Sequence, residues 1–436
     1  MTEHHDDHGH HDNGGVRIPT DPVNASGLQT VALVSAAAGL IAFVVLGFLN
    51  MSAGDYGWRD VSMTYLIGWT FWVSLPLGAL FLMLVGIMTS ASWGVVLRRC
   101  FTASIRTLWV FPVLMVPIAV SLFVAGGNQS PYWWADSGYD GDVASIAEAK
   151  HLRPEAVVEN QHKIHDLLNP VKFLAATAVG FALIGGLSVF TLRVVGRHED
   201  HGSAQTYSTV RRLAGPGVIL WVLTMTVLST IWIVSVESTW ASSMFPIVYG
   251  MNCFLTTFAF CIFVFYTVNA DKSDTMAIVK EKFRIDMGTL TMAFTMLWAY
   301  ASFSQYMLIW AGNLPEEVAY YRKRGDHGWE YLAYFLMAFH WLVPFVALLF
   351  RDVKTNTKLM RSLCALLLVV CVADVIWWVL PCVPHETGVL HVPMAVAAVV
   401  GLGGVWGYVF ARELGTKPAL PANAEGQFVA AWGQHH

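Results

Sequence analysis

The chain has 436 residues, of which 56% are hydrophobic and only 13% are charged, and its formal net charge is −4. An average soluble domain carries roughly 25% charged residues, so this composition excludes a water-soluble globular protein. It also excludes a strongly basic surface, and we expect no nucleic-acid partner.

Residues 1–27 form a polar tail with histidines at positions 4, 5, 8, 10 and 11 among aspartates and glycines. Such a tract can bind a metal adventitiously, but its composition favours a solvated segment. We therefore predict a disordered, His-rich tail without a catalytic role.

Ten apolar runs follow, each long enough for a bilayer span of roughly 20 residues. They are 28–49, 65–88, 104–125, 171–195, 217–236, 246–268, 287–309, 331–350, 360–380 and 392–411. The sequence therefore predicts an all-α polytopic membrane protein with about ten transmembrane helices. The membrane domain should cover 28–411, with a first bundle at about 65–236, a second at about 246–380, one helix on either side and a tail at 412–436.

Lys and Arg gather in the two tails and in alternate loops, and cytoplasmic loops are those that keep positive charge. Both termini of this multi-pass membrane protein are therefore predicted to be cytoplasmic, with the loop 126–170 outside. The cluster Arg322, Lys323 and Arg324 on the outer face is the main exception to this rule.

The outer loop carries an aromatic run, Tyr132, Trp133 and Trp134. Aromatic side chains gather at the headgroup level, so this run is either an interfacial belt or a set of contacts to a ligand. Glu237 follows the fifth span near the outer interface. It either releases protons to the outside or is simply solvated.

Ionisable residues at membrane depth mark functional sites. Asp374 is the only acidic residue and His340 the only histidine inside the ten predicted spans. At about 1.5 Å of rise per residue, both lie at a depth similar to that of Tyr300. We therefore predict a proton relay of Asp374, His340 and Tyr300, with Glu237 as an outer member. The alternative is a neutral Asp374 whose hydrogen bonds only fix the packing.

A lone buried histidine cannot supply the paired axial ligands of a membrane cytochrome b. The six cysteines show no C-x-x-C spacing, whereas iron–sulfur and structural zinc sites need clustered thiolates. We therefore expect this chain to bind no metal and no redox cofactor.

The seventh span leads into an unusual segment. Gly312 allows the helix to end, and Asn313 is predicted to cap a short outer helix, with Pro315 in its first turn and Glu316 three residues on. Glu316 and Glu317 are predicted to contact a partner or to guide protons on the outer face.

The run Phe303-Ser-Gln-Tyr and the following Ile309-Trp-Ala-Gly-Asn-Leu-Pro-Glu-Glu317 closely resemble the signature of the ActF family. These are NrfD-like membrane subunits of bacterial alternative complex III. The resemblance implies two four-helix bundles flanked by two helices, in a complex that oxidises quinol and reduces cytochrome c or an oxidase. It also implies three kinds of partner: a homologous NrfD-like quinol-binding subunit, an iron–sulfur subunit and haem c subunits.

The first bundle offers only hydroxyl groups at membrane depth, such as those of Ser74 and Thr224. Quinol oxidation is therefore expected in the homologous partner, and assembly and proton movement in this chain. Two alternatives remain: a secondary transporter, which would contain broken helices around a midplane site, and a purely structural anchor of the complex.

Overall fold

The structure is a computed structural model. It describes residues 21–420 except 52–56, 125–128, 137–141, 150–156, 159–160, 163, 165–167, 202–203, 238–239, 273–275, 277, 326–327 and 384–389. Most of the predicted tails at 1–27 and 412–436 therefore lie outside the described residues. Within the described ranges the regular secondary structure is helical, apart from one isolated bridge between Pro22 and Pro418.

The first half of the described chain contains the longer helices α1, α2, α9 and α10 and several short ones. These are α1 (Ser26–Met51), α2 (Gly57–Met88), α3 (Ser92–Val96), α4 (Arg98–Arg106), α5 (Val110–Leu114), α6 (Val116–Ser121), η2 (Trp133–Ala135), α7 (Val143–Ala149), α9 (Pro170–His201), α10 (Ala204–Trp232) and η4 (Val234–Val236).

The second half follows the same pattern, with short helices at the turns. These are α11 (Phe245–Val268), α13 (Glu281–Gly312), α14 (Pro315–Arg324), α15 (Trp329–Leu336), the π-helix η5 (Met337–Leu342), α16 (Val343–Leu349), α17 (Arg351–Thr355), α18 (Thr357–Val379), η6 (Leu380–Cys382) and α19 (His391–Leu414).

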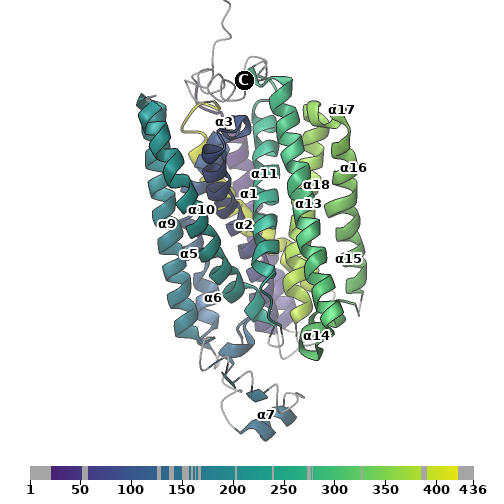
Figure 1. Ribbon diagram of the computed structural model, residues 1–436. Helices are drawn as coiled ribbons and strands as arrows, with labels where there is room; N and C mark the ends of the chain where they lie inside the picture. The colour runs from purple at the N-terminus through teal and green to yellow at the C-terminus, as the bar shows by residue number, and fades with distance from the viewer. Residues whose placement is uncertain are drawn as a thin grey trace, which may run out of the picture.

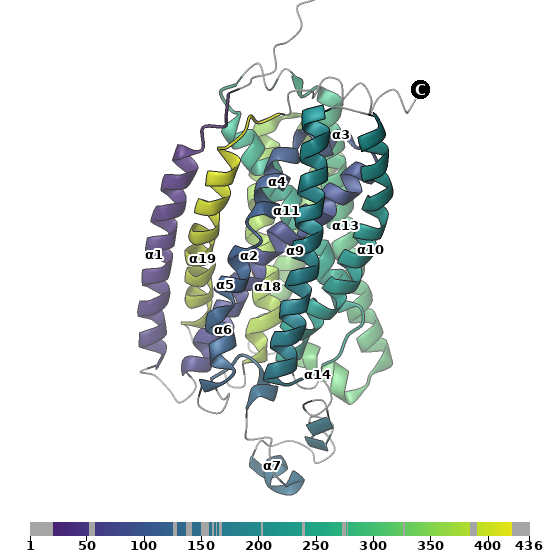
Figure 2. The same cartoon turned by 90° about the vertical axis from the view of Figure 1, so that its left-hand side faces the viewer.

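The long helices stand side by side as two bundles (Figure 1). In the first bundle α2 contacts α4 and α10, and α10 contacts α9; in the second, α11 contacts α13 and α18, and α18 contacts α15 and η5. Contacts of α2 with α11 join the bundles. On one side, α1 packs on α19, which packs on α2 (Figure 2). The predicted all-α polytopic membrane fold is confirmed.

Eight described helices are long and apolar enough to cross a membrane, and the bent pair formed by α4 with α5 and α6 makes a ninth span if it is counted as one. The remaining predicted span corresponds to α13, which has 32 residues but does not meet the same criterion. Charged residues fill the first turns of α13, and hydroxyl groups recur along it.

The predicted continuous span 104–125 is broken, with a bend of 46° between α4 and the α5–α6 segment. Pro112 has no N–H to donate to the carbonyl of Leu108, and the Thr107 hydroxyl donates to the carbonyl of Ser104 at 2.6 Å. The segment beyond the bend is held by α2, because Trp69 Nε1 donates to the carbonyl of Phe111 at 3.1 Å. The break is therefore packed against protein.

The two ends of the described chain meet on one face. The N–H of Val23 donates to the carbonyl of Lys417 at 3.1 Å, beside the bridge between Pro22 and Pro418. We call this end of the molecule the tail face. Helices α14 and α7 lie at the opposite end (Figure 1), which we call the α14 face.

Candidate functional site

The second bundle encloses a polar cluster around Asp374, which is 2% exposed. Asp374 Oδ2 accepts hydrogen bonds from Asn252 Nδ2 on α11 at 3.0 Å and from Trp298 Nε1 on α13 at 2.8 Å. The Asn252 side chain is itself fixed, because its Oδ1 accepts from the Thr256 hydroxyl at 3.1 Å. Three helices therefore hold one carboxyl group inside the bundle.

His340 completes the cluster from η5 and is fully buried. Its Nδ1 lies 3.9 Å from Asp374 Oδ2 and makes no hydrogen bond, while its Nε2 lies 3.7 Å from Cys371 Sγ. The imidazole stacks on the Trp298 indole with ring centroids 3.6 Å apart. The predicted approach of His340 to Asp374 is thus present in the structure, just beyond hydrogen-bond length.

The π-helical turn gives His340 this position. Pro344 follows it by four residues and has no N–H for the carbonyl of His340, which favours a local departure from α-helical bonding. π-helical turns are rare in proteins, and many of those that occur lie at functional sites. The sequence predicts a regular helix over 331–350, and no local pattern in it indicates the π-helical turn at His340.

Tyr300 does not join the cluster. It is 68% exposed, so the expected third member of the relay lies on the outside of α13. Trp298 instead faces the inside of the bundle. It lies on the same face of α13 as Thr291, Thr295 and Gln305, which are all buried. The recurrence of these polar residues at helical spacing was the signal that could have identified the inner face of α13.

The buried hydroxyl groups of the cluster extend toward the tail face. The Thr295 hydroxyl, about one turn from Trp298, donates to the carbonyl of Thr291 at 2.9 Å, and the Thr291 hydroxyl donates to the carbonyl of Met287 at 2.9 Å. Both side chains are fully buried. Thr256 also lies one turn from Asn252 in this direction.

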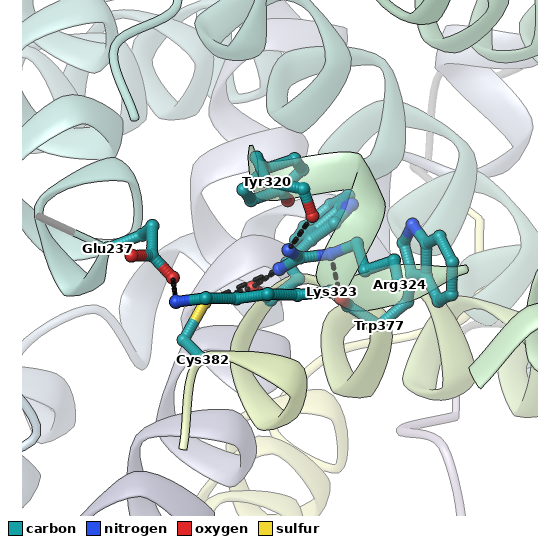
Figure 3. A network of polar contacts seen from close by, with 7 residues as sticks. Glu237, Tyr320, Lys323, Arg324, Trp377 and Cys382 are labelled. Atoms are coloured by element: carbon teal, nitrogen blue, oxygen red, sulfur yellow. Dashed lines mark hydrogen bonds and ion pairs between the residues drawn. The ribbon is translucent and has the colours of Figure 1, made fainter. Parts of the chain in front are cut away.

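Glu237 lies in a separate network near α14 (Figure 3). Its Oε2 accepts from Lys323 Nζ at 2.8 Å; the Glu237 side chain is 5% exposed and that of Lys323 is 47% exposed. Glu237 is therefore paired with a cation, and no contact joins it directly to Asp374 among the described hydrogen bonds and ion pairs.

Arg324 is the buried centre of the same network (Figure 3). Its guanidinium donates to the carbonyls of Trp377 at 3.0 Å, Trp378 at 2.8 Å and Tyr320 at 2.8 Å, and Nη2 lies 3.4 Å from Cys382 Sγ. Trp377 and Trp378 lie in the last turn of α18, where carbonyl groups have no partner within the helix. Arg324 thus caps the helix that carries Asp374.

The turn between α13 and α14 differs from the expected cap. Asn313 adopts a left-handed conformation (φ 47°, ψ 35°) and ends α13, and its N–H donates to the carbonyl of Ile309 at 3.1 Å. Leu314, without a side-chain cap, precedes α14. The prediction that Asn313 caps the outer helix is wrong, because Asn favours this left-handed position after a helix. Glu316 and Glu317 lie in the first turn of α14, and their role stays a prediction.

The outer aromatic run packs inward. Tyr132, Trp133 and Trp134 are at most 5% exposed, and Tyr132 Oη donates to the carbonyl of Trp232 at 3.0 Å. Tyr132 also stacks on Trp134, with centroids 5.0 Å apart. Because these side chains are buried, they are not an interfacial belt; they pack at the α14-face end of the first bundle.

A second buried acid–base pair escaped the sequence analysis. His391 Nε2 lies 3.0 Å from Asp60 Oδ2, which also accepts from Asn50 Nδ2 at 3.1 Å, and all three residues are at most 9% exposed. They join α19, α2 and α1 at the ends away from the tail face. Asp60 and His391 lie just outside the predicted spans 65–88 and 392–411 but inside α2 and α19, so the described helices bury a second acid and a second histidine beside Asp374 and His340.

No family model matches this chain, and no curated protein is similar to it. Its chemistry must therefore be inferred from its own residues. Among the described residues, no group of three His, Cys, Asp or Glu side chains is placed to hold a metal ion. The Asp374–His340 cluster contains a carboxyl group, an imidazole with an unbonded nitrogen and hydroxyl groups nearby, which are groups that bind and transfer protons.

Proposed function

We propose that this chain is an integral membrane subunit that carries protons at the Asp374–His340 pair, within a quinol-oxidising respiratory complex of the alternative complex III type. The observation that carries the proton role is the unbonded His340 Nδ1, fully buried and 3.9 Å from Asp374 Oδ2. The motif from Phe303 to Glu317 supports the choice of complex.

The pair would work by a small movement. A shortening of about 1 Å would bring His340 Nδ1 within hydrogen-bond distance of Asp374 Oδ2. Asn252 and Trp298 would hold the carboxyl group in place during this change, since each donates to Oδ2. Stacking on Trp298 would keep the imidazole plane aligned. Asp374 would then bind the proton, and His340 would pass it on.

An exposed aromatic face on the second bundle supports a place in a complex. Tyr300 and Phe303 on α13 and Tyr334 on α15 are each more than 60% exposed. Tyr300 lies about 18 Å along the helix from Gly312, deeper than the headgroup belt. A phenol hydroxyl at that depth finds no partner in lipid, whereas tyrosine, phenylalanine and methionine are enriched in protein interfaces.

In this proposal the chain lies in the bacterial inner membrane with both termini in the cytoplasm. Redox cofactors would belong to its partners: a homologous NrfD-like subunit that binds quinol, an iron–sulfur subunit and haem c subunits. The first turn of α14, with Glu316 and Glu317, would contact a peripheral subunit on the outer face.

The deciding experiment compares two substitutions of Asp374 in the purified complex, reconstituted in sealed vesicles. Asp374→Asn keeps shape and hydrogen bonding but cannot titrate, so we expect normal assembly with reduced proton movement per quinol or slower turnover. Asp374→Leu should in addition destabilise the protein by about 1–3 kcal/mol, because Asn252 and Trp298 lose their acceptor.

An Asn variant with undiminished proton movement and turnover would reduce the pair to a packing role and leave the structural anchor as the better function. Co-purification of the wild-type chain with haem c and iron–sulfur subunits tests the assignment to this complex separately. Isolation as a lone, solute-binding protein would favour a transporter.

A further inference from the structure

Arg324 brings a positive charge into the protein without a bonded carboxylate. It is 1% exposed, and the acceptors of its N–H groups are backbone carbonyls and the Cys382 sulfur. A guanidinium cannot be deprotonated in proteins. The nearby carboxylate of Glu237 is bonded to Lys323, and burial raises the pKa of Tyr320 well above its ordinary value, so this phenol stays neutral.

An aromatic layer surrounds this charge. The guanidinium lies 3.4 Å from the Tyr320 ring centroid, and Tyr320 stacks on Trp240 with centroids 3.8 Å apart. Phe245 contacts both Trp240 and Trp378, each at 5.2 Å between centroids. All four rings are at most 5% exposed.

The layer lies between the Asp374–His340 pair and the α14 face. Trp378 follows Asp374 by one turn toward η6, and Phe245 begins α11 two turns before Asn252. In the opposite direction, the pair is continued by the buried hydroxyls of Thr256, Thr295 and Thr291. The buried positive charge therefore lies on the α14 side of the pair, whereas the tail side carries threonine hydroxyls among the rings of Phe258 and Phe294.

A fixed cation in a narrow, dry passage excludes protons and other cations. Three carbonyl bonds hold Arg324 in place, so its charge cannot move aside without leaving the last turn of α18 uncapped. We infer that Arg324 closes the Asp374–His340 pair toward the α14 face, so that the pair exchanges protons only with the tail face. This inference rests on the proposed proton role of Asp374.

The first test uses the full-length chain, uniformly oriented in liposomes. The infrared band of the Asp374 carboxyl group is identified by its loss in Asp374→Asn. A pH jump applied to one side at a time should shift this band from the tail face only. A response from the α14 face overturns the inference and leaves the proposed function intact, whereas a band that follows neither side overturns both.

The second test measures passive proton flux through the same liposomes with a pH-sensitive dye. Arg324→Gln should raise the flux severalfold, and Asp374→Asn added to it should return the flux to the wild-type level. Arg324→Lys keeps the charge and should stay near wild type even if its melting temperature falls. Lys323→Gln is the matched control, because it removes a cation of α14 that is half exposed, and its flux should not change.

A folded Arg324→Gln variant with wild-type flux would contradict the inference, as would a flux that Asp374→Asn does not abolish. If Arg324→Gln fails to fold, the infrared experiment on the wild-type chain still decides between the two outcomes.

Discussion

Asp374 and Asp60 are both buried carboxyl groups beside a histidine, but they lie at different distances from it. Asp60 Oδ2 lies 3.0 Å from His391 Nε2, whereas Asp374 Oδ2 takes its bonds from an amide and an indole and stands 3.9 Å from His340 Nδ1. A closed pair holds its helices together. An open pair, with neutral donors on the acid, retains the freedom to form and break its contact, which suits proton transfer.

The closed pair should make a measurable contribution to stability. We expect Asp60→Ala and His391→Ala each to destabilise the protein and to be strongly non-additive, with a coupling energy of about 1–3 kcal/mol, because either change leaves the other group buried without its partner. Unfolding of the two single variants and the double variant in detergent measures this energy.

The exposed pair Arg106–Glu413, at the other end of α19, is the matched control. Its atoms are 3.3 Å apart, but the side chains are 41% and 29% exposed, so its coupling should not exceed about 1 kcal/mol. Equal coupling energies for the two pairs would show that burial does not set the strength of the Asp60–His391 contact.

The Asp60–His391 pair also shows why apolar runs were shorter than the helices that contain them. The predicted spans began at 392 and 65, immediately after His391 and five residues after Asp60, because a count of apolar residues stops at the first polar side chain. In the structure, α19 starts at His391 and α2 at Gly57. The two polar residues lie 3.0 Å apart inside the helices, and no single-span pattern reveals a partner more than 300 positions away.

At the scale of helices, the pairing of α1 with α19 depends on glycine. A Cβ on Gly39 would overlap the backbone of Gly401, and one on Gly404 would overlap that of Ala36. The two backbones therefore approach more closely than side chains would permit, as small residues allow between membrane helices.

We expect Gly39→Val to separate α1 from α19 and to lower the melting temperature in detergent. Gly27→Ala on the same helix is the control, because nothing lies within 4 Å of the added atom. Disulfide cross-linking between cysteines introduced into α1 and α19 would report the separation directly. An unchanged cross-linking yield in Gly39→Val would show that the helices adapt without glycine.

The exposed face of α13 leads to a prediction about assembly. Replacing Tyr300 and Phe303 together with alanine should reduce the recovery of partner subunits while the isolated chain keeps its melting temperature, because both side chains are more than 60% exposed. Ile41→Ala on α1 is the control, since Ile41 is 65% exposed among aliphatic neighbours. Equal recovery of partners from both variants would indicate that lipid covers this face of α13.

For the whole molecule, the structure accounts for the cluster at 322–324, which was the main exception to the positive-inside rule. Of the three cations at 322–324, Arg324 is buried as a helix cap and Lys323 is bonded to Glu237. Both cations have partners within the protein. We therefore give them little weight as free charges that set the orientation in the membrane. The remaining distribution of Lys and Arg favours a cytoplasmic tail face.

A fluorescent protein that matures only in the cytoplasm, fused to the C-terminus, should therefore be fluorescent. The same result is expected for a fusion at the N-terminus, because the two ends of the described chain meet at Val23 and Lys417. Fluorescence from a fusion placed in the loop between α6 and α9 would contradict this orientation.

The helical fold and eight of the ten predicted spans followed from hydrophobic runs, because bilayer thickness fixes the length of a span. The functional details did not follow in the same way. The depth of Asp374 and His340 could be counted along the chain, but depth does not state direction around a helix, and Tyr300 at a similar depth lies on the outside. The π-helical turn at η5 and the capping role of Arg324 arise from tertiary contacts, which a local pattern does not contain.

The pairing of α1 with α19 also has a consequence for biogenesis. The contacts of α1 among the described helices are mainly with α19, and residues 52–390 lie between the two, so α1 is made tens of seconds before its partner at ordinary rates of synthesis. During that time the small residues of α1 that pack on α19, such as Ala36 and Gly39, do not yet have their partner. Synthesis of α19 lets it cover these residues, and a chain truncated before His391 would keep them uncovered.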